Sequence, residues 1–583
     1  MLHTLTRSLR ENKSPALVTV LLSALEVVFE IVIPLFMSNL IDFGIEGGSM
    51  AAVWKFGAFL LLLAAFQLAT GVLAARIAAR ASVGFAANLR EDMYDNVQTF
   101  AFSNIDKFST ASIVTRLTTD TTNVQNAFQM LMRMAIRAPV MLIFSMIVSF
   151  RISRDISMTF LIILPILALA LFFIIRSVFP VFTRVFRTYD ELNNVVQENV
   201  RGIRVVKSFN QERHEIGKFG AISARIYQDF SKGERLITLN APLMQFCIYT
   251  CMIVISWLGA KAIIASGNDP ALGLTTGNLT ALITYTMQIL SSLMMLSMVF
   301  AMLTISLSSA RRIAEVLEER SDIPQPEQPV MTVRNGAVDF DHVSFVYASK
   351  ADKKVLDDID LHIRSGETIG IIGGTGASKS SLVQLIPRLY DVTGGKLTLG
   401  GVDVRDYDLD TLRGAVAMVL QKNELFSGTI KENLRWGNEN ATDEELRHAC
   451  ELACADGFIS AMPDGYDTHI EQGGTNVSGG QKQRLCIARA LLKKPKVLIL
   501  DDSTSAVDTR TDAQIQQALS TYIPDTTKII IAQRISSVQN ADRIVVLDDG
   551  HIDAVGSHDE LLRTCEIYRE VYESQQKGGE DDA

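Results

Sequence analysis

The chain has 583 residues, which is too long for a single domain. Hydrophobic residues make up 48% of it and the mean hydropathy is +0.22, so a wholly soluble protein is not expected. The net charge of −9 and the lack of an obvious basic face argue against a nucleic-acid partner, and six scattered cysteines argue against a disulfide framework.

The first 315 residues are predicted to cross a lipid bilayer six times. Six apolar windows are long enough for about 30 Å of hydrocarbon. They lie near residues 16–41, 54–75, 129–150, 157–179, 241–264 and 279–305. Arg7 and Arg10 precede the first window, which is too long for the apolar part of a cleavable signal peptide. We therefore expect a retained anchor with the N-terminus in the cytoplasm.

Two of the connections between these windows are long and polar. They cover about 81–128 and 180–238, and both carry several Arg and Lys residues. The positive-inside rule places them in the cytoplasm, although the loop Arg151–Asp155 runs against the rule with two Arg residues. Both segments are predicted to be helical and to continue the membrane helices beyond the bilayer.

Two acidic residues fall inside the first apolar window. Glu26 and Glu30 are one helical turn apart and therefore share one face of the helix. Ionisable side chains inside a bilayer are costly, so a functional role is the default hypothesis. They could attract a cationic amphipathic substrate, or they could pair with Arg133 or Arg137 on the third span.

The pattern changes after residue 315. A linker is predicted over 316–332, where Pro324, Pro326 and Pro329 favour an extended backbone. Strands and helices then alternate, which predicts an α/β domain over 333–572. The acidic, Gly-containing segment 573–583 is expected to be disordered. The predicted fold class is an all-α six-helix membrane domain followed by an α/β nucleotide-binding domain.

A phosphate-binding loop is predicted between the apolar strand 369–372 and an amphipathic helix, which is the context that this motif requires. Its small residues let backbone N–H groups and a helix N-terminus approach phosphates. The loop comprises Gly373, Gly374, Thr375, Gly376, Ala377, Ser378, Lys379, Ser380 and Ser381. We expect Lys379 to reach the β- and γ-phosphates of ATP and Ser380 to bind Mg²⁺. Ser378 replaces the usual Gly, which we expect to strain or displace the loop and to weaken affinity somewhat.

A second apolar strand ends on two carboxylates. The run 497–500 is followed by Asp501, a residue type suited to holding a nucleotide-bound Mg²⁺. Asp502 comes next. An acidic residue at this point could act as a general base, which requires a reach of roughly 2.6–3.2 Å to the proton it abstracts.

The order of these motifs resembles that of the ATP-binding cassette (ABC) transporters. Tyr347 stands upstream of the phosphate loop, where the family has an aromatic ring that stacks on adenine. Gln421 matches the Q-loop, which in the family senses Mg²⁺ and contacts the coupling regions, so Ser380, Gln421 and Asp501 are the expected metal ligands.

The signature motif is also similar to that of the family. The run 476–481 lacks only the usual Leu, and its expected contacts to phosphate are Ser478, Gly479, Gly480 and Gln481. Asp508 matches the D-loop. The six upstream spans resemble an exporter half-transporter, with coupling regions near 104–110 and 198–206. In such dimers the signature of one subunit serves the nucleotide that the other subunit holds.

The general-base and switch positions of the chain's own site also depart from the family pattern. Asp502 stands where the catalytic base is normally Glu, and Gln533 stands where the switch loop normally has His. The signature is intact, whereas the residues of the chain's own site are altered. This division resembles the degenerate-site subunit of bacterial heterodimeric multidrug exporters, and it implies a partner half-transporter with a catalytic Glu and a switch His. The competing interpretation is a homodimer with two slow sites.

The resemblance implies a function that uses ATP and Mg²⁺. The expected activity is ATP-driven efflux of small hydrophobic or amphipathic compounds, drugs or lipids, across the cell membrane. One alternative keeps the fold and imports siderophore-like substrates. Another is a regulatory ATP-binding membrane protein that transports nothing.

Overall fold

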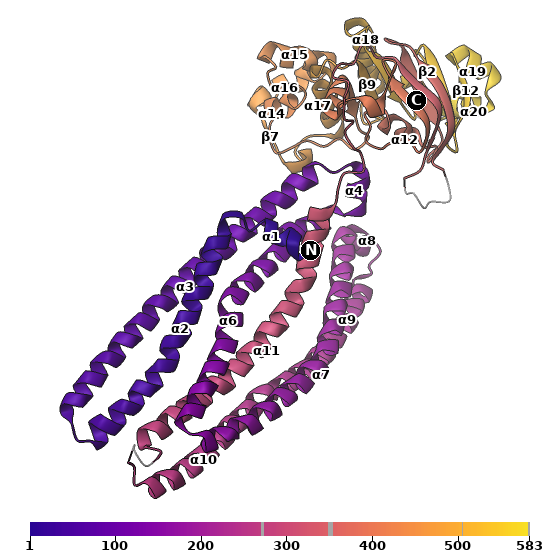
Figure 1. The fold of residues 1–583 in the computed structure, drawn as a ribbon. Coiled ribbons are helices and arrows are strands. Elements are labelled where there is room, and N and C mark those ends of the chain that lie inside the picture. Colours follow the sequence, from indigo (N-terminus) through magenta and orange to yellow (C-terminus); the bar gives the residue numbers. More distant parts are fainter. Residues whose placement is uncertain (270–272, 348–353, 504, 581–583) are drawn as a thin grey trace. The chain divides into compact units, whose positions relative to one another are not determined.

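The computed structural model describes residues 1–583 apart from 270–272, 348–353, 504 and 581–583. Its contacts divide the chain into two compact units (Figure 1). The first comprises Met1–Gln98 and Thr110–Glu319, and the second comprises Thr99–Ser109 and Arg320–Ala583. The first unit therefore lacks Thr99–Ser109 of the predicted membrane domain, 1–315, and extends into the predicted linker as far as Glu319.

The described residues of the first unit form helices joined by short turns and loops. Among the residues that the structure describes, six helical segments are long and apolar enough to cross a membrane, which confirms the six predicted spans. The long helices are α2 (Lys13–Asn39), α3 (Met50–Gln98), α6 (Thr121–Ile152), α7 (Arg154–Arg201), α10 (Asn240–Ser266) and α11 (Thr276–Glu318). Helix α9 (Glu212–Thr238) is as long as α2 and α10. Shorter elements are α1 (Leu2–Arg7), η1 (Arg10–Asn12), η2 (Leu40–Glu46), α5 (Thr110–Thr115), η3 (Arg116–Asp120) and α8 (Ile203–Ser208).

The long helices outrun the apolar windows because the polar segments continue the same helices. Helix α3 packs along α2, α6 packs along α11, and the polar end of α7 packs along α9 (Figure 1). A helix satisfies its own backbone hydrogen bonds, which is the requirement for a segment that crosses hydrocarbon.

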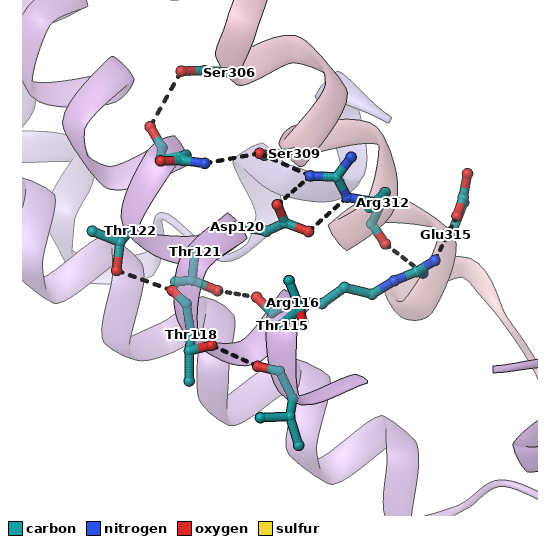
Figure 2. Close-up of polar contacts among 12 residues, drawn as sticks. Thr115, Arg116, Thr118, Asp120, Thr121, Thr122, Ser306, Ser309, Arg312 and Glu315 are labelled. Carbon is teal, nitrogen blue, oxygen red and sulfur yellow. Dashed lines mark hydrogen bonds and ion pairs between the residues drawn. The ribbon is translucent and has the colours of Figure 1, made fainter. Parts of the chain in front are cut away.

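A polar cluster joins the start of α6 to the end of α11 (Figure 2). The chain enters α6 through the π-helical turn η3, whose last residue, Asp120, is buried and accepts hydrogen bonds from Nε and Nη2 of Arg312. Arg116 donates to the Arg312 carbonyl at 2.8 Å and to Glu315 at 3.1 Å. Because each Arg reaches across to the facing helix, the cluster fixes the register between the two helices.

The second unit is built on a six-stranded sheet in the order β12-β11-β3-β10-β9-β6. Only the β11–β12 pairing in it is antiparallel. The strands are β3 (Thr368–Gly373), β6 (Val416–Val419), β9 (Val497–Asp501), β10 (Thr527–Ile531), β11 (Arg543–Asp548) and β12 (His551–Gly556). β9 and β10 are buried at every position, as expected for strands covered on both faces.

Two smaller sheets complete the second unit. An antiparallel sheet has the order β2-β1-β4-β5, and β7 pairs with β8. Their strands are β1 (Val338–Phe345), β2 (Leu356–Ile363), β4 (Gly394–Leu399), β5 (Val402–Asp403), β7 (Gly428–Thr429) and β8 (His469–Ile470). The helices and helical turns are α4 (Phe102–Lys107), α12 (Lys379–Gln384), η4 (Val404–Asp406), α13 (Leu409–Ala415), α14 (Ile430–Arg435), α15 (Asp443–Leu452), α16 (Asp456–Ser460), η5 (Gly465–Asp467), η6 (Gln472–Gly474), α17 (Gly479–Leu492), α18 (Thr509–Tyr522), η7 (Ile535–Ser537), α19 (His558–Thr564) and α20 (Glu566–Glu580).

Helix α4, from the first predicted coupling region, is a structural part of the second unit. Tyr390 donates to Asp106 at 2.8 Å, and its ring lies 6.1 Å from that of Phe102. These contacts explain why 99–109 groups with the nucleotide-binding domain rather than with the helices on either side of it in the sequence.

The C-terminus also differs from the expectation. The tail 573–583 was expected to be disordered, but α20 continues through it to Glu580, and 581–583 lie outside the described residues. Ile567, Tyr568, Val571 and Tyr572 form an apolar stripe at helical spacing that packs on the core of the second unit. This packing stabilises a helix that composition alone does not predict.

Candidate nucleotide site

The predicted site residues follow the carboxyl ends of parallel strands. β3 ends at Gly373, β9 at Asp501, β10 at Ile531 and β6 at Val419. The strands are in register at this edge, with Ile531 opposite Asp501. The phosphate loop, the two Asp residues, the switch loop and the Q-loop therefore emerge together, at the edge of an open α/β sheet where ligands bind.

Lys379 begins α12 and lies over the phosphate loop. Its ammonium donates to the carbonyls of Gly373 at 2.8 Å and Gly374 at 2.9 Å. Burial lowers the pKa of Lys379, while the nearby carboxylates of Asp501 and Asp502 act in the opposite direction. The lysine is thus a cation held close to the loop, where it could meet phosphate oxygens.

Ser378 precedes α12 in the left-handed region, with φ of +67°. An L-residue pays a steric penalty there that Gly avoids. This backbone angle gives a physical reason for the strain expected when Ser replaces Gly in the phosphate loop.

Ser380 and Asp501 are brought together as the sequence predicts for a metal site. Burial raises the pKa of the Asp501 carboxyl, and a hydrogen bond from the Ser380 side chain opposes that shift. Hydroxyl and carboxylate oxygens are ligands that Mg²⁺ accepts, and Mg²⁺ usually takes its other ligands from phosphate and water. Within the described residues, no cluster of three or more His, Cys, Asp or Glu side chains could hold a metal ion. This pair therefore fits Mg²⁺ only in company with a nucleotide.

Tyr347 lies beside the phosphate loop. Its hydroxyl is 2.7 Å from that of Ser381, and its ring makes edge contacts with Phe345 and Tyr390. The residue remains 44% exposed, so a face of the ring is accessible for stacking.

The two residues that depart from the family pattern contact each other. Asp502 Oδ2 accepts a hydrogen bond from Gln533 Nε2 at 2.8 Å and another from Gln421 Nε2 at 3.3 Å. Burial raises the pKa of Asp502, while these two hydrogen bonds oppose the shift. Gln421, predicted as a metal ligand, thus directs its amide nitrogen to Asp502.

The signature motif is ordered by its own helix. Ser478 caps α17 in a capping box, in which Gln481 N–H donates to the Ser478 hydroxyl oxygen at 3.3 Å and Ser478 N–H donates to Gln481 Oε1 at 2.9 Å. Asp508, the predicted D-loop residue, caps α18 by accepting from Thr511 N–H. Both short motifs therefore have local structural roles.

Sequence reasoning missed two glutamines that organise this region. Gln483 accepts from Ala506 N–H at 3.0 Å and donates to Ser505 Oγ at 3.2 Å, which ties the D-loop to α17. Gln575, on α20, contacts the backbone of the switch loop. Neither lies in a run that departs from ordinary helical composition, so the sequence carries no signal for them.

Glu26 and Glu30 lie in the first unit and share one partner. The Arg137 guanidinium donates to Glu26 at 2.8 Å and to Glu30 at 2.7 Å. Gly71 on α3 stands close by, since a Cβ there would lie 3.2 Å from Glu26 Oε1. Of the two alternatives left open by the sequence, pairing with the third span is therefore what the structure shows.

The fold and the grouped motifs define an ATP-binding cassette fused to a six-span membrane domain. The family described as the ABC transporter transmembrane region matches residues 16–294, and the family described as ABC transporter matches residues 356–505. The chain belongs to the ABC transporters and has the exporter-type half-transporter architecture.

Individual relatives agree with this assignment over nearly the whole chain. The ABC transporter ATP-binding protein YfiB of Bacillus subtilis is 35% identical over 558 residues, covering 96% of each chain. The ATP-dependent lipid A-core flippase of Desulfotalea psychrophila is 31% identical over 489 residues, covering 84% of each chain. The structure of a bacterial Atm1-family ABC exporter with ATP bound has a TM-score of 0.80 at 24% identity, covering 97% of this chain and 98% of the other, so its likeness concerns the fold.

Proposed function

We propose that the chain is one subunit of a heterodimeric ABC exporter in the cell membrane, and that its own ATP site hydrolyses poorly. The complex would use ATP to expel hydrophobic or amphipathic compounds, with the N-terminus and the nucleotide-binding domain in the cytoplasm. The observation that carries the proposal is the contact of Asp502 with two glutamine amides beside an intact, capped signature.

The chemistry of the altered pair supports slow hydrolysis. A general base must reach the proton that it abstracts, and the Asp502 carboxylate is one methylene shorter than the usual Glu. The amide of Gln533 does not titrate near neutral pH, so it cannot accept or pass on a proton as an imidazole does. Mg²⁺, held by Ser380 and Asp501, would neutralise charge on the nucleotide phosphates. The residues of this site therefore favour the binding of ATP over its hydrolysis.

The signature motif supports the proposal that this chain works with a partner subunit whose ATP is hydrolysed. Ser478 and the backbone at the start of α17 offer donors at a helix N-terminus, a favourable place for phosphate. In an ABC dimer these donors would face the nucleotide of the partner, where a catalytic Glu and a switch His would carry out hydrolysis. ATP held by this chain would then act as a clamp across many turnovers.

The proposed substrate class is inferred from a relative and from charged residues inside the membrane domain. The lipid A-core flippase among the relatives acts on a lipid, as its name says, and the six-span domain is compatible with an apolar substrate. The triad of Glu26, Glu30 and Arg137 has two carboxylates for one guanidinium, so a cationic group of the substrate could approach it. Replacing Arg137 by Gln should destabilise the protein by about 3–5 kcal/mol if the triad is structural, because two carboxylates lose their partner.

Further substitutions separate the two roles of the triad. A triple variant with all three residues changed to Gln should recover stability. Loss of transport of cationic compounds alone, with neutral compounds unaffected, would instead support a substrate role.

A homodimer and a regulatory ATP-binding protein are the alternatives that an ATPase measurement distinguishes from the proposal. We would purify the chain alone and together with a co-expressed half-transporter, and measure ATPase activity in each. The proposal expects little activity alone and strong activity in the pair, which is lost when the partner's catalytic Glu is changed to Gln. Robust activity from this chain alone would mean that Asp502 is a competent base and would contradict a poor site, whereas slow activity that no co-expressed half-transporter raises would favour a homodimer with two slow sites. A pair whose ATPase does not respond to any transported compound would favour a regulatory ATP-binding protein.

A further inference from the structure

The C-terminal helix α20 is anchored on the core of the second unit. Tyr568 is fully buried, and Val571 and Tyr572 pack beside it. Gln575 follows Tyr568 by seven residues, which is two helical turns, so the two side chains lie on the same side of the helix. The anchored part of α20 thus determines where the Gln575 side chain lies.

Gln575 makes a two-point contact with the switch loop. Its Oε1 accepts a hydrogen bond from Ile535 N–H at 2.9 Å, and its Nε2 donates to the carbonyl of Gln533 at 2.7 Å. The carboxamide therefore pairs with two backbone groups that flank Arg534, as another peptide group would. This double contact constrains both the position and the orientation of the loop.

Gln533 in the switch loop is held through its side chain as well as through its backbone. The side chain of Gln533 donates to Asp502 Oδ2, while its backbone carbonyl accepts from Gln575. A continuous series of hydrogen bonds therefore runs from the C-terminal helix through the switch residue to the altered base. The 3₁₀ turn that follows is fixed as well, because Ser537 donates to Asp512 on α18 at 2.6 Å.

We propose that Gln575 is a positioning residue for the nucleotide site of this chain, and that it keeps the amide of Gln533 on Asp502. The effect on nucleotide retention rests on the proposed function, since it assumes a site that binds ATP and releases it slowly. Release of α20 from the switch loop would free Gln533, loosen the site and shorten the time for which nucleotide stays bound. The C-terminal helix thereby gains a role in the ATP cycle beyond packing.

The test compares two neighbouring glutamines in the full complex. Gln575→Met has nearly the same volume but removes both hydrogen bonds, and Gln575→Glu keeps the acceptor while losing the donor. Gln576→Met is the matched control, because Gln576 donates to Tyr572 within its own helix at 2.6 Å and makes no other side-chain hydrogen bond among the described residues. Amide hydrogen exchange at Ile535 and dissociation of a fluorescent ATP analogue are measured in each variant.

We expect Gln575→Met to speed exchange at Ile535 by about five-fold, because the Ile535 amide loses one ordinary hydrogen bond. Nucleotide retention should shorten by about the same factor, because the Gln533 carbonyl loses one as well. Gln575→Glu should be intermediate, and Gln576→Met should match the wild type. Unchanged exchange at the amide of Tyr568 would show that α20 itself remains folded in the variants.

The possible failures are distinguishable. Unchanged exchange at Ile535 in Gln575→Met would overturn the contact, and faster exchange with unchanged retention would overturn the positioning role. A wild-type site that hydrolyses ATP readily would instead remove the proposed function. The positioning role of Gln575 would then be tested by the effect of Gln575→Met on that hydrolysis. An unchanged rate of hydrolysis would refute the positioning role.

Discussion

Hydrolysis at the site of this chain should be recoverable by two substitutions. Asp502→Glu restores the usual length of the base, and Gln533→His supplies an imidazole at the switch position. Each change alone should do less than both together. With Asp502→Glu alone the Gln533 amide can still contact the carboxylate, and with Gln533→His alone the carboxylate remains short.

The size of the gain follows from geometry. The additional C–C bond extends the carboxylate by about 1.5 Å, and a misplacement of about 1 Å can cost a reaction about 100-fold. General-base catalysis contributes about 10²–10⁴-fold in all. We therefore expect the double variant to hydrolyse about 100-fold faster at this site, which corresponds to about 2.7 kcal/mol in the barrier.

The assay must count turnovers at this site alone. In a heterodimer the partner's site already works, so total ATPase activity would at most about double, because only two sites exist per dimer. Vanadate traps ADP after hydrolysis, and a photoreactive radiolabelled ATP then marks the subunit whose site turned over. Label on this chain should rise in the double variant and disappear when Lys379→Ala is added, since Lys379 is the expected contact to phosphate.

Equal labelling of the wild type and the double variant would refute the reasoning. Asp502 would then be a competent base, and the contact with Gln533 would have no catalytic consequence. A total ATPase gain of about 100-fold, rather than about two-fold, would show two slow sites and hence a homodimer.

Three further predictions concern single positions. Ser378→Gly should stabilise the phosphate loop by up to about 1.5 kcal/mol, since it removes left-handed strain of about 1–2 kcal/mol and loses about 0.5–1 kcal/mol to backbone entropy; a lower Tm and weaker ATP binding would contradict this. Tyr347→Ala should weaken ATP binding in a fluorescence titration by about 1–3 kcal/mol, the typical contribution of aromatic stacking on a base, whereas Tyr347→Phe should change it little. The hydrogen bond between His342 and Asp358 raises the pKa of His342 above its ordinary value. The stabilisation that this contact provides is therefore complete below the pKa of His342 in the unfolded chain, about 6.5. It is lost as the pH rises through the pKa of His342 in the folded protein. The difference in Tm between the wild type and His342→Gln should therefore shrink from about pH 6 to about pH 9, and a constant difference would show that this contact does not titrate.

The fold class and most of the nucleotide site could be predicted because their signals are local. Asp501 follows a run of buried strand residues, and Lys379 stands between a Gly-rich loop and a helix. Parallel strands bring their carboxyl ends to one edge, so residues far apart in the sequence meet there. Membrane spans are equally local, because the length of an apolar run decides them.

The contacts that could not be predicted join residues with no shared pattern. Gln575 lies 42 residues beyond Gln533, and nothing in either run indicates that they meet. Arg137 was one of two possible partners for the acidic pair on the first span, and only the arrangement of the helices decides between them. The end of α20 is a third case, because its composition favours disorder while the packing of Tyr568 favours a helix.

Helix α4 has a consequence for how the protein is made. Asp106 precedes its partner Tyr390 by 284 residues, although both belong to one compact unit. At roughly 5–20 residues per second, the ribosome completes α4 about 15–60 s before its docking surface exists. Four of the six membrane-spanning helical segments are synthesised in that interval. α4 can therefore dock on its partner Tyr390 only after these four segments of the membrane domain have been synthesised. Folding of the nucleotide-binding domain is completed after synthesis of the membrane domain.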